Sequence, residues 1–290
     1  MPGSGEGLTL DFVHRWIEDS AYAQALGVRL EAIDAENARL ALPFDESLTN
    51  GDQVMHGGCA ASLATLGAQA IARATLGEES GPWHTAALQV AYLAAAKSQG
   101  VTANARLQRG GKEICFVEVD VTGENGRAIA HATAVVHARF GAEPPELVRS
   151  AGDHGEADPG KMGPHIGRIP FIGGRGIAVE HMTGGTSRLV MPWCEANADA
   201  AGGVHEGALL SLLDTAGAMA SWAVTGFGPY RAGTPAMHAQ LLAPPPKDDL
   251  VAYGRNAQRD GALFFSDVEV AGASDGCIVA RGTVFYRIVT

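Results

Sequence analysis

The chain has 290 residues, 46% of them hydrophobic and 18% charged. It is long enough for roughly two domains of about 100–150 residues, each with a buried core. The formal net charge of −11 argues against a broad nucleic-acid-binding surface, so any anionic ligand would need basic groups gathered locally.

Signals of export, membrane insertion and metal binding are weak. The first residues, MPGSGEGLTLDF, lack a basic region followed by an apolar stretch, so we expect no signal peptide. The longest apolar run, Gly57 to Ala72, is shorter than the roughly 20 residues that span a bilayer, and we expect no membrane partner. The four cysteines form no CxxC pair, which argues against a zinc site or a disulfide framework. We therefore expect no metal and a reduced, cytoplasmic setting.

The chain contains an internal repeat with an offset of 149 to 150 residues. His56 and His205 each open a long apolar run, and Thr85 and Thr234 each open the segment that follows it. Two further pairs of glycine-containing turns recur in the same order and at nearly the same offset. Such an ordered repeat indicates two copies of one structural unit in tandem.

In chain order, we expect a helix from Leu10 to Asp19 that leads the first unit only. Two short strands follow, GVRLEAI and ARLALPF. The long helix that begins at Gly57 has no charge before Arg73, so it is expected to be buried on most sides. Alternating apolar residues predict four more strands, near 84–93, 101–109, 113–122 and 127–139.

The segment 141–164 separates the two copies. It is rich in Gly, Pro, Asp and Glu and has no hydrophobic period, which is typical of a linker. We expect a first unit at 1–140, this linker at 141–164 and a second unit at 165–290. A buried helix wrapped by a strongly curved antiparallel sheet gives each unit an α+β fold.

The motifs of the first unit resemble those of the hotdog-fold acyl-CoA thioesterases, in particular the phenylacetic-acid-pathway branch. That branch has a loop Asn six residues before His-Gly-Gly, an acid nine residues after the His, and a Thr or Ser that opens the next strand, which carries a Tyr-Leu pair. This chain has Asn50, an HGG motif at His56 and a YL pair at Tyr92. The segment from Ala25 to Val28 is also similar to the first strand of that family. The resemblance covers nearly all of both units and implies a tandem double hotdog.

The two units depart from the family motif in complementary ways. Nine residues after His56 the first unit has Thr65, whereas nine residues after His205 the second unit has Asp214. Six residues before His205 stands Asp199 in place of Asn. The first unit thus keeps the Asn-His-Gly half of the motif, and the second unit keeps the acid.

In the family, each active site lies between two hotdog units, so the resemblance implies that Asn50, His56 and Gly57 face Asp214. The opposite pairing would set Asp199, His205 and Glu206 against Thr65. Because that interface has no acid at the helix position, we expect it to be inactive or repurposed.

Thioester hydrolysis gives these residue types roles. The Gly57 N–H at a helix N-terminus would stabilise charge on the carbonyl oxygen. Asp214 would act as general base for water or as a nucleophile that forms an anhydride. His56 and Asn50 would shape the loop or help to bind the carbonyl, and Thr234 would hold the water or orient Asp214. Each residue also has a structural interpretation, as a paired core acid, a helix entry, a turn residue or a strand start.

The resemblance also implies where coenzyme A would bind. Lys97, Arg109 and Lys112 stand where the family places basic strand ends and turns, and basic groups are what phosphates need. Ordinary solvated turn residues are the alternative. Coenzyme A would enter as part of the substrate, and no other cofactor is expected.

The sequence therefore predicts an acyl-CoA thioesterase with one composite site per chain. A hotdog enoyl-CoA hydratase or dehydratase is an alternative, although the Asp and His run of those enzymes is missing beside both helices. A non-catalytic acyl-CoA-binding protein with two decayed sites is another. Because the sheets leave outer surfaces, chains are expected to pack into a homo-oligomer.

Overall fold

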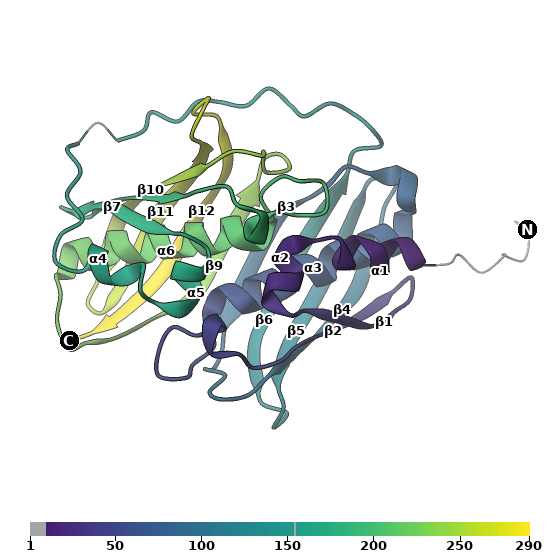
Figure 1. Ribbon diagram of the computed structural model, residues 1–290, viewed down its shortest axis with the longest axis horizontal. Helices are drawn as coiled ribbons and strands as arrows, with labels where there is room; N and C mark the ends of the chain where they lie inside the picture. The colour runs from purple at the N-terminus through teal and green to yellow at the C-terminus, as the bar shows by residue number, and fades with distance from the viewer. Residues whose placement is uncertain (1–9, 154) are drawn as a thin grey trace, which may run out of the picture.

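The computed structural model describes residues 10–153 and 155–290. Figure 1 shows the first unit, purple to blue, beside the second, green to yellow. The start of the chain at 1–9, on which the expectation about a signal peptide largely rests, lies outside the described residues.

The first unit is built around one long helix. The helix predicted from Gly57 and the four strands after it are confirmed almost residue for residue. The segment from Ala25 to Val28 is not a strand. It contains the end of a short helix that Ser20 caps and that Gly27 stops at a φ of 77°, a left-handed conformation that glycine adopts without strain. The elements in chain order are α1 (Asp11–Glu18), α2 (Ala21–Leu26), β1 (Arg29–Ile33), β2 (Asn37–Leu42), η1 (Glu46–Leu48), α3 (Gly57–Leu76), η2 (Glu78–Ser80), β3 (Trp83–Tyr92), β4 (Val101–Gly110), β5 (Ile114–Gly123) and β6 (Ala128–Ala138).

The second unit repeats this plan, including its helical lead. The expectation that only the first unit has such a lead is wrong, because two short helices precede the first strand here as well. Each has a proline in its first turn, where a missing N–H costs nothing, but each is too short to show a helical period. The elements are α4 (Gly163–Ile166), α5 (Pro170–Gly174), β7 (Ala178–Thr183), β8 (Thr186–Met191), η3 (Glu195–Asn197), α6 (Glu206–Thr225), β9 (Arg231–Leu241), β10 (Leu250–Asp260), β11 (Leu263–Gly272) and β12 (Ile278–Val289).

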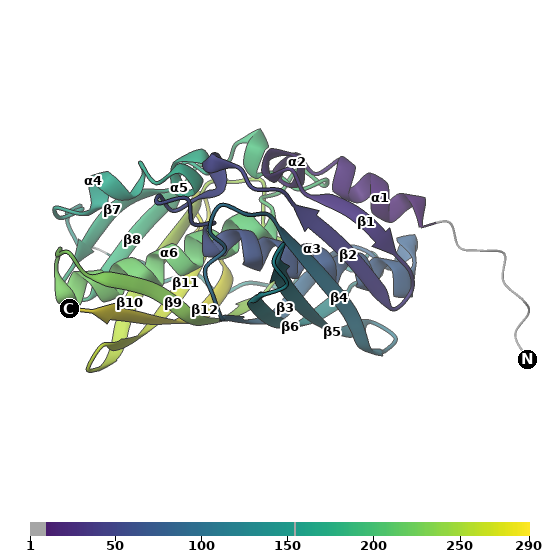
Figure 2. The same ribbon diagram turned by 90° about the horizontal axis from the view of Figure 1, so that it is seen from below.

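All strands join in one sheet with the order β1-β2-β4-β5-β6-β3-β9-β12-β11-β10-β8-β7. The units meet where β3 pairs antiparallel with β9, from Leu88 opposite Ala239 to Ala91 opposite Ala236. Figure 2 shows both central helices on the same side of this sheet, which curls around them. This is the double hotdog that the sequence predicts, with the joining edge of each unit satisfied inside one chain.

The central helices α3 and α6 cross near their N-terminal ends through small residues. A Cβ on Gly58 would overlap the Ser211 side chain, and a Cβ on Gly207 would overlap Ser62. Each glycine therefore permits a close approach that alanine would block. Among the described helices α6 alone is long and apolar enough to span a membrane by length and composition, and 89% of its most apolar window is buried, as suits a core helix.

The connection between the units runs along the second unit. Between Ala138 and Gly163 the described residues form no helix or named strand. The Ile278 N–H donates to the Val148 carbonyl oxygen over 2.8 Å, so this segment is held against the start of β12.

Candidate functional site

The loop before α3 ends at His56, one of the predicted site residues. His56 is the N-cap of α3, and its Nδ1 accepts a hydrogen bond from the Gly58 N–H over 2.9 Å. This bond puts the ring proton on Nε2, and burial lowers the pKa of His56 to about 4. The ring stacks on Phe171 of α5, with 4.5 Å between centroids. His205 caps α6 in the same way, by accepting a hydrogen bond from the Gly207 N–H. The histidine that recurs in both units is therefore a helix N-cap.

The N–H of Gly57 stays available at this helix end. The next two N–H groups, of Gly58 and Cys59, bond to His56, whereas no described residue accepts a hydrogen bond from Gly57 N. The first N–H groups of a 20-residue helix carry its partial positive charge. An electron-rich oxygen is the partner that such a group favours.

Asn50 lies in the loop that leads to His56, and its side chain is exposed. With the amide nitrogen turned toward the loop, it donates to the carbonyl oxygens of Val54 and Gly51 over 3.0 and 2.9 Å. In this orientation Asn50 supports the loop, and its part in binding the carbonyl stays a prediction. Lys97 is exposed and forms a β-bridge with Val54, so it borders the same loop.

Asp214 lies in the middle of α6 and is 8% exposed. The Thr234 hydroxyl on β9 donates to its Oδ1 over 2.8 Å. Burial raises the pKa of Asp214 to about 6, against the opposing effect of the Thr234 hydrogen bond. Near neutral pH this buried carboxylate is mostly ionised and still basic enough to take a proton.

The helix crossing brings the two halves of the predicted site together. Gly58 packs on Ser211, and Asp214 lies three residues further along α6, about one turn away on the same face. Tyr92, at the end of β3, lies near both halves. Its ring would lie 3.2 Å from a Cβ on Gly57, and the Asp214 charge adds to burial in raising the pKa of Tyr92. Tyr92 therefore lies beside both the N-terminus of α3 and the acid of α6.

The opposite interface is filled by different groups. Glu206 takes the place of Gly57, and its Oε1 accepts a hydrogen bond from the Thr85 N–H over 2.9 Å. The Thr65 hydroxyl donates to the carbonyl oxygen of Ser62 in its own helix. Burial raises the pKa of Glu206. A buried carboxylate thus enters this interface from the helix N-terminus, and the helix position that holds the acid in the first interface has none.

A buried arginine lies on the α3 side of this second interface. Arg73 donates to Gln69 Oε1 over 2.7 Å, and its guanidinium carbon lies 3.7 and 4.2 Å from the ring centroids of Trp16 and Trp83. In the repeat, Ala218 and Trp222 take the places of Gln69 and Arg73. The composite site is therefore apolar where the second interface is charged.

Sequence reasoning missed Glu206 as a partner of Thr85, and it quoted Tyr92 without giving it a role. A signal for the first was present, since Glu206 is the one charge in the first turn of an otherwise apolar run. The role of Tyr92 depends on the helix crossing, which no local pattern reports.

Two of the three basic residues expected near coenzyme A lie elsewhere. Arg109 and Lys112 are exposed in the hairpin between β4 and β5. A Cβ on Gly110 would lie 3.2 Å from Thr75, near the C-terminal end of α3 and about 27 Å along that helix from Gly57. Within one chain, Arg109 and Lys112 thus lie far from Gly57, whereas Lys97 borders the Asn50 loop, and contact with coenzyme A stays a prediction for all three.

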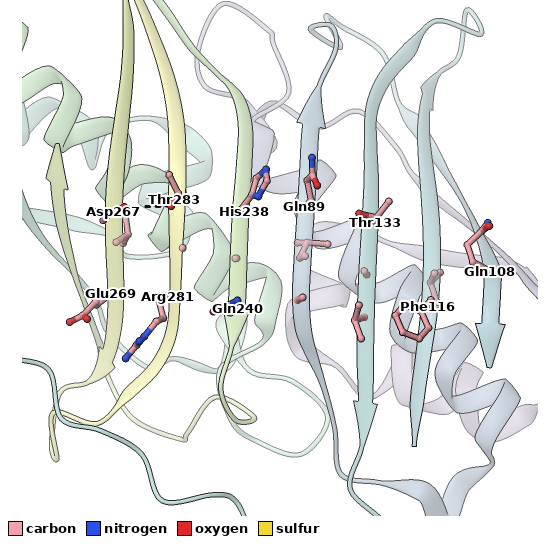
Figure 3. Close-up of a pocket in the computed structure, with 18 residues that line it drawn as sticks. Gln89, Gln108, Phe116, Thr133, His238, Gln240, Asp267, Glu269, Arg281 and Thr283 are labelled. Carbon is pink, nitrogen blue, oxygen red and sulfur yellow. Dashed lines mark hydrogen bonds between the residues drawn. The ribbon is translucent and has the colours of Figure 1, made fainter. Parts of the chain in front are cut away.

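A hollow of about 740 Å³ lies on the outer face of the sheet, across the seam of β3 and β9 (Figure 3). Gln89 and His238 stand on either side of that seam. Gly282 also lines the hollow, but a Cβ on it would lie 3.2 Å from Leu213 of α6. The sheet therefore separates this hollow from Asp214, and it is not part of the composite site.

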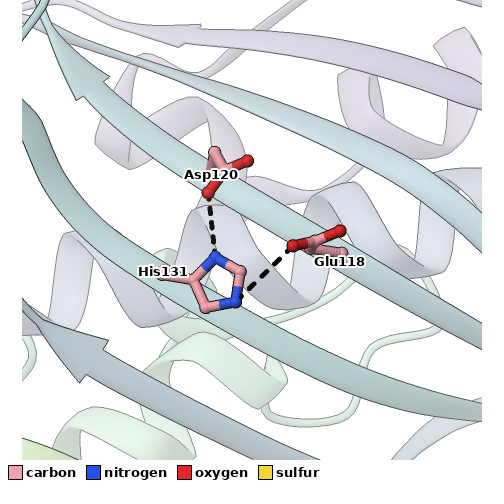
Figure 4. Close-up of side chains that lie close together, drawn as sticks. All are labelled: Glu118, Asp120 and His131. Carbon is pink, nitrogen blue, oxygen red and sulfur yellow. Dashed lines mark hydrogen bonds and ion pairs between the residues drawn. The ribbon is translucent and has the colours of Figure 1, made fainter.

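Three further polar side chains meet on the outer face of β5 and β6 (Figure 4). His131 lies 2.8 Å from Asp120 through Nδ1 and 3.7 Å from Glu118 through Nε2. Arg106 also donates to Glu118, over 2.6 Å. Both ring nitrogens have partners, and the guanidinium would oppose a cation, so the contacts describe a surface charge network. Residue spacing along the chain could not reveal this trio, because it forms across two strands.

Comparison with known proteins places these features in context. Residues 44–137 match the family model described as the acyl-CoA thioesterase N-terminal domain. An inferred esterase of Halobacterium salinarum is 30% identical over 131 residues, which are 44% of this chain and 86% of that protein.

Two solved structures are similar over both units. An inferred thioesterase II from Thermobifida fusca superposes with a TM-score of 0.67 at 18% identity, over 93% of this chain and 97% of that chain. A TesB protein of Mycobacterium avium subspecies paratuberculosis gives 0.62 at 13% identity, over 97% and 100%. These likenesses concern the double-hotdog fold.

Proposed function

This chain belongs to the hotdog-fold thioesterase family and is a thioester hydrolase, and on that premise we propose that it hydrolyses acyl-CoA at one composite site between its two units. The observation that carries the proposal is the buried Asp214 carboxylate, which accepts a hydrogen bond from Thr234. It lies about one turn along α6 from the helix crossing, where Gly57 begins α3. Within the family we propose the phenylacetic-acid-pathway branch, supported by the spacing of Asn50 and His56.

The proposed reaction uses two charges of opposite sign. The thioester carbonyl oxygen accepts a hydrogen bond from the Gly57 N–H at the positive end of α3, which favours the negative charge that forms there. Asp214 takes a proton from water as the water oxygen bonds to the carbonyl carbon. The carbon–sulfur bond then breaks, and coenzyme A leaves as a thiolate that regains a proton. This chemistry needs no metal and no cofactor beyond the coenzyme A of the substrate.

We favour the base role of Asp214 over the nucleophile role. A pKa of about 6 suits proton transfer near neutral pH, and the Thr234 bond to Oδ1 fixes the carboxylate while leaving Oδ2 to face a water. An anhydride that water opens at the Asp214 carbonyl carbon would pass an Asp214 oxygen into the acid product and leave a water oxygen in Asp214. A single turnover in ¹⁸O-labelled water, with mass analysis of the protein, tests for this route, and label in Asp214 would refute the base role.

The two parts of the substrate would lie on opposite sides of Gly57. Ala218 and the Trp222 ring offer an apolar wall for the acyl group, and Trp222 is fixed by a hydrogen bond to Tyr286 over 3.2 Å. Lys97, next to the Asn50 loop, offers a positive charge for a phosphate of coenzyme A.

Thiol release tests the proposal. The purified protein would be incubated with acetyl-CoA, hexanoyl-CoA, palmitoyl-CoA and phenylacetyl-CoA in the presence of a thiol-trapping dye. Thiol release above the buffer rate is expected for at least one of them. No release from any of the four would sink the proposal.

The same preparation separates the two competing functions. A hydratase or dehydratase would convert crotonyl-CoA into a hydroxyacyl-CoA with its thioester intact. A non-catalytic binding protein would show a raised midpoint of thermal unfolding with acyl-CoA and no product. The raised pKa of the single buried acid at the composite site favours hydrolysis over both.

Assembly and location complete the proposal. We propose a homo-oligomer, supported by the partly exposed aromatic rings of Phe116 and Phe265 on the outer sheet face. Size-exclusion chromatography with light scattering tests it, and a mass of one chain would refute it. We also propose a cytoplasmic location, which is consistent with four unpaired cysteines, and no nucleic-acid or membrane partner. Fractionation of expressing cells tests the location.

A further inference from the structure

Tyr92 has a buried hydroxyl that bonds to nothing. It is the last residue of β3, and its hydroxyl oxygen has no hydrogen-bond partner among the described residues. The ring lies against the N-terminus of α3, since a Cβ on Gly57 would lie 3.2 Å from Cε1 and 3.6 Å from Cζ. Because Cζ carries the hydroxyl, that hydroxyl lies close to the helix end whose N–H is available.

The other buried tyrosines are treated differently. The Tyr22 hydroxyl is 2.8 Å from Ser62 Oγ, and the Tyr286 hydroxyl accepts a hydrogen bond from Trp222. Burying a hydroxyl without a partner costs free energy, so native proteins rarely keep one without a reason. A bound molecule that completes the hydrogen bond is such a reason.

The hydroxyl is present at one interface only. At the equivalent position of the second unit stands Leu241, and the glycine under the ring is replaced by Glu206. The hydroxyl, the accessible N–H of Gly57 and the Asp214 carboxylate therefore occur together, and the interface without the helix acid has none of the three.

The hydroxyl keeps a proton that it can donate. Burial and the charge of Asp214 raise the pKa of Tyr92 well above 10, so it keeps its proton over the whole working range of pH. A protonated hydroxyl beside a helix N-terminus suits an oxygen that becomes negative.

We propose that the Tyr92 hydroxyl is a second donor to the thioester carbonyl oxygen, acting beside the Gly57 N–H. The inference rests on the proposed hydrolysis. As the water oxygen bonds to the carbonyl carbon and Asp214 takes the water proton, the carbonyl oxygen becomes negative and both donors shorten their bonds to it. The carbon–sulfur bond breaks, the carbonyl re-forms, and Asp214 returns its proton to the leaving thiolate. Tyr92 keeps its own proton throughout.

Tyr92→Phe tests the proposal, since it removes the oxygen and keeps the ring over Gly57. We expect kcat on the best acyl-CoA of the panel to fall about 100-fold, as on the loss of one oxyanion donor, with KM within about threefold of wild type. The midpoint of thermal unfolding should stay the same or rise, because the lost hydroxyl has no partner in the free protein. A structural hydroxyl would give the reverse pattern.

Tyr22→Phe is the matched control. It removes a buried hydroxyl that has a partner, at the other interface, so it should lower the midpoint and leave kcat within about threefold. A kcat of Tyr92→Phe within threefold of wild type, while Asp214→Asn is inactive, would overturn the role of Tyr92 and leave the proposed function standing. Failure of the wild-type protein to hydrolyse any thioester would overturn both.

Discussion

The two interfaces between α3 and α6 are built from equivalent helices but contain different side chains. At one, a bare glycine at a helix N-terminus faces a buried acid held by Thr234. At the other, the glycine is replaced by Glu206, whose carboxylate bonds to Thr85. Thr85 and Thr234 are equivalent in the repeat, so each interface has a carboxylate beside the same strand position, delivered from a different helix position.

Under the proposed function, the difference explains how one copy of a duplicated site could lose its reaction and keep its structure. A carboxylate at the helix N-terminus sits where the carbonyl oxygen would have to bind, and like charges repel. The same carboxylate receives a backbone N–H and lies near the positive end of α6, which favours it there. Under the proposed function, the second interface would hold the units together and the first would admit a substrate.

The largest expected difference between the two interfaces comes from neutralising each carboxylate in turn. Asp214→Asn should lower kcat about 1,000-fold, since a general base contributes typically about 100- to 10,000-fold. Glu206→Gln, the matched change at the other interface, should leave kcat within about threefold. Steady-state thiol release with the same acyl-CoA measures both.

Retained turnover in Asp214→Asn would refute the composite site. Loss of turnover in Glu206→Gln with an unchanged far-ultraviolet circular dichroism spectrum would show that the second interface is catalytic after all.

The pH dependence of hydrolysis should report the same acid. Because burial raises the pKa of Asp214 to about 6, the base is protonated below that value. We expect kcat to fall about tenfold per pH unit below pH 6 and to level off above pH 7. A profile that stays flat down to pH 4.5 would mean that Asp214 is not the base.

The buried Asp214 carboxylate should also weaken the fold. The folded-state pKa of about 6 lies above the ordinary value of 3.8, so the native state binds more protons between these values and stability falls as pH rises through that window. Asp214→Asn should therefore raise the free energy of unfolding by about 2–3 kcal/mol at pH 8, and by little at pH 4.

Urea unfolding of both proteins at the two pH values measures this difference. Equal stabilisation at pH 4 and pH 8 would point to packing, and not to the buried charge.

The smallest expected effect comes from restoring the missing acid. Thr65→Asp places a carboxylate at the helix position of the second interface, but Glu206 still occupies the carbonyl position. We expect total activity to stay within about 1.5-fold of wild type. The background of Asp214→Asn gives the cleanest measurement. Activity that returns in the double variant would show that the start of α6, at His205 and Glu206, can bind a carbonyl.

Much of this arrangement was predictable from the repeat. The offset of 149 predicted the two central helices, because each follows from a pattern that is local to its unit. The hydrogen bond from Thr234 to Asp214 matches one of the two roles that the family resemblance implied for Thr234. The equivalence of the units also predicted that one interface would lack an acid at Thr65.

The rest depends on contacts that residue spacing does not report. The approach of Tyr92 to Gly57 follows from how β3 passes the helix crossing. The residue type and turn position of Arg109 favour a phosphate contact, but its hairpin lies at the C-terminal end of α3, far from Gly57. The short helices α4 and α5 hold too few residues for a hydrophobic period, although their prolines marked where they start.

The seam where β3 pairs with β9 has a consequence for how such a protein could arise. Two copies of the first unit alone would pair bare glycine ends with Thr65, and two copies of the second would pair Glu206 ends with Asp214. Only the mixed pair combines a bare glycine end with an acid at the helix position. Fusion in one chain supplies the two units in equal amounts and keeps them next to each other. The polypeptide therefore corresponds to a heterodimer whose two halves are covalently linked.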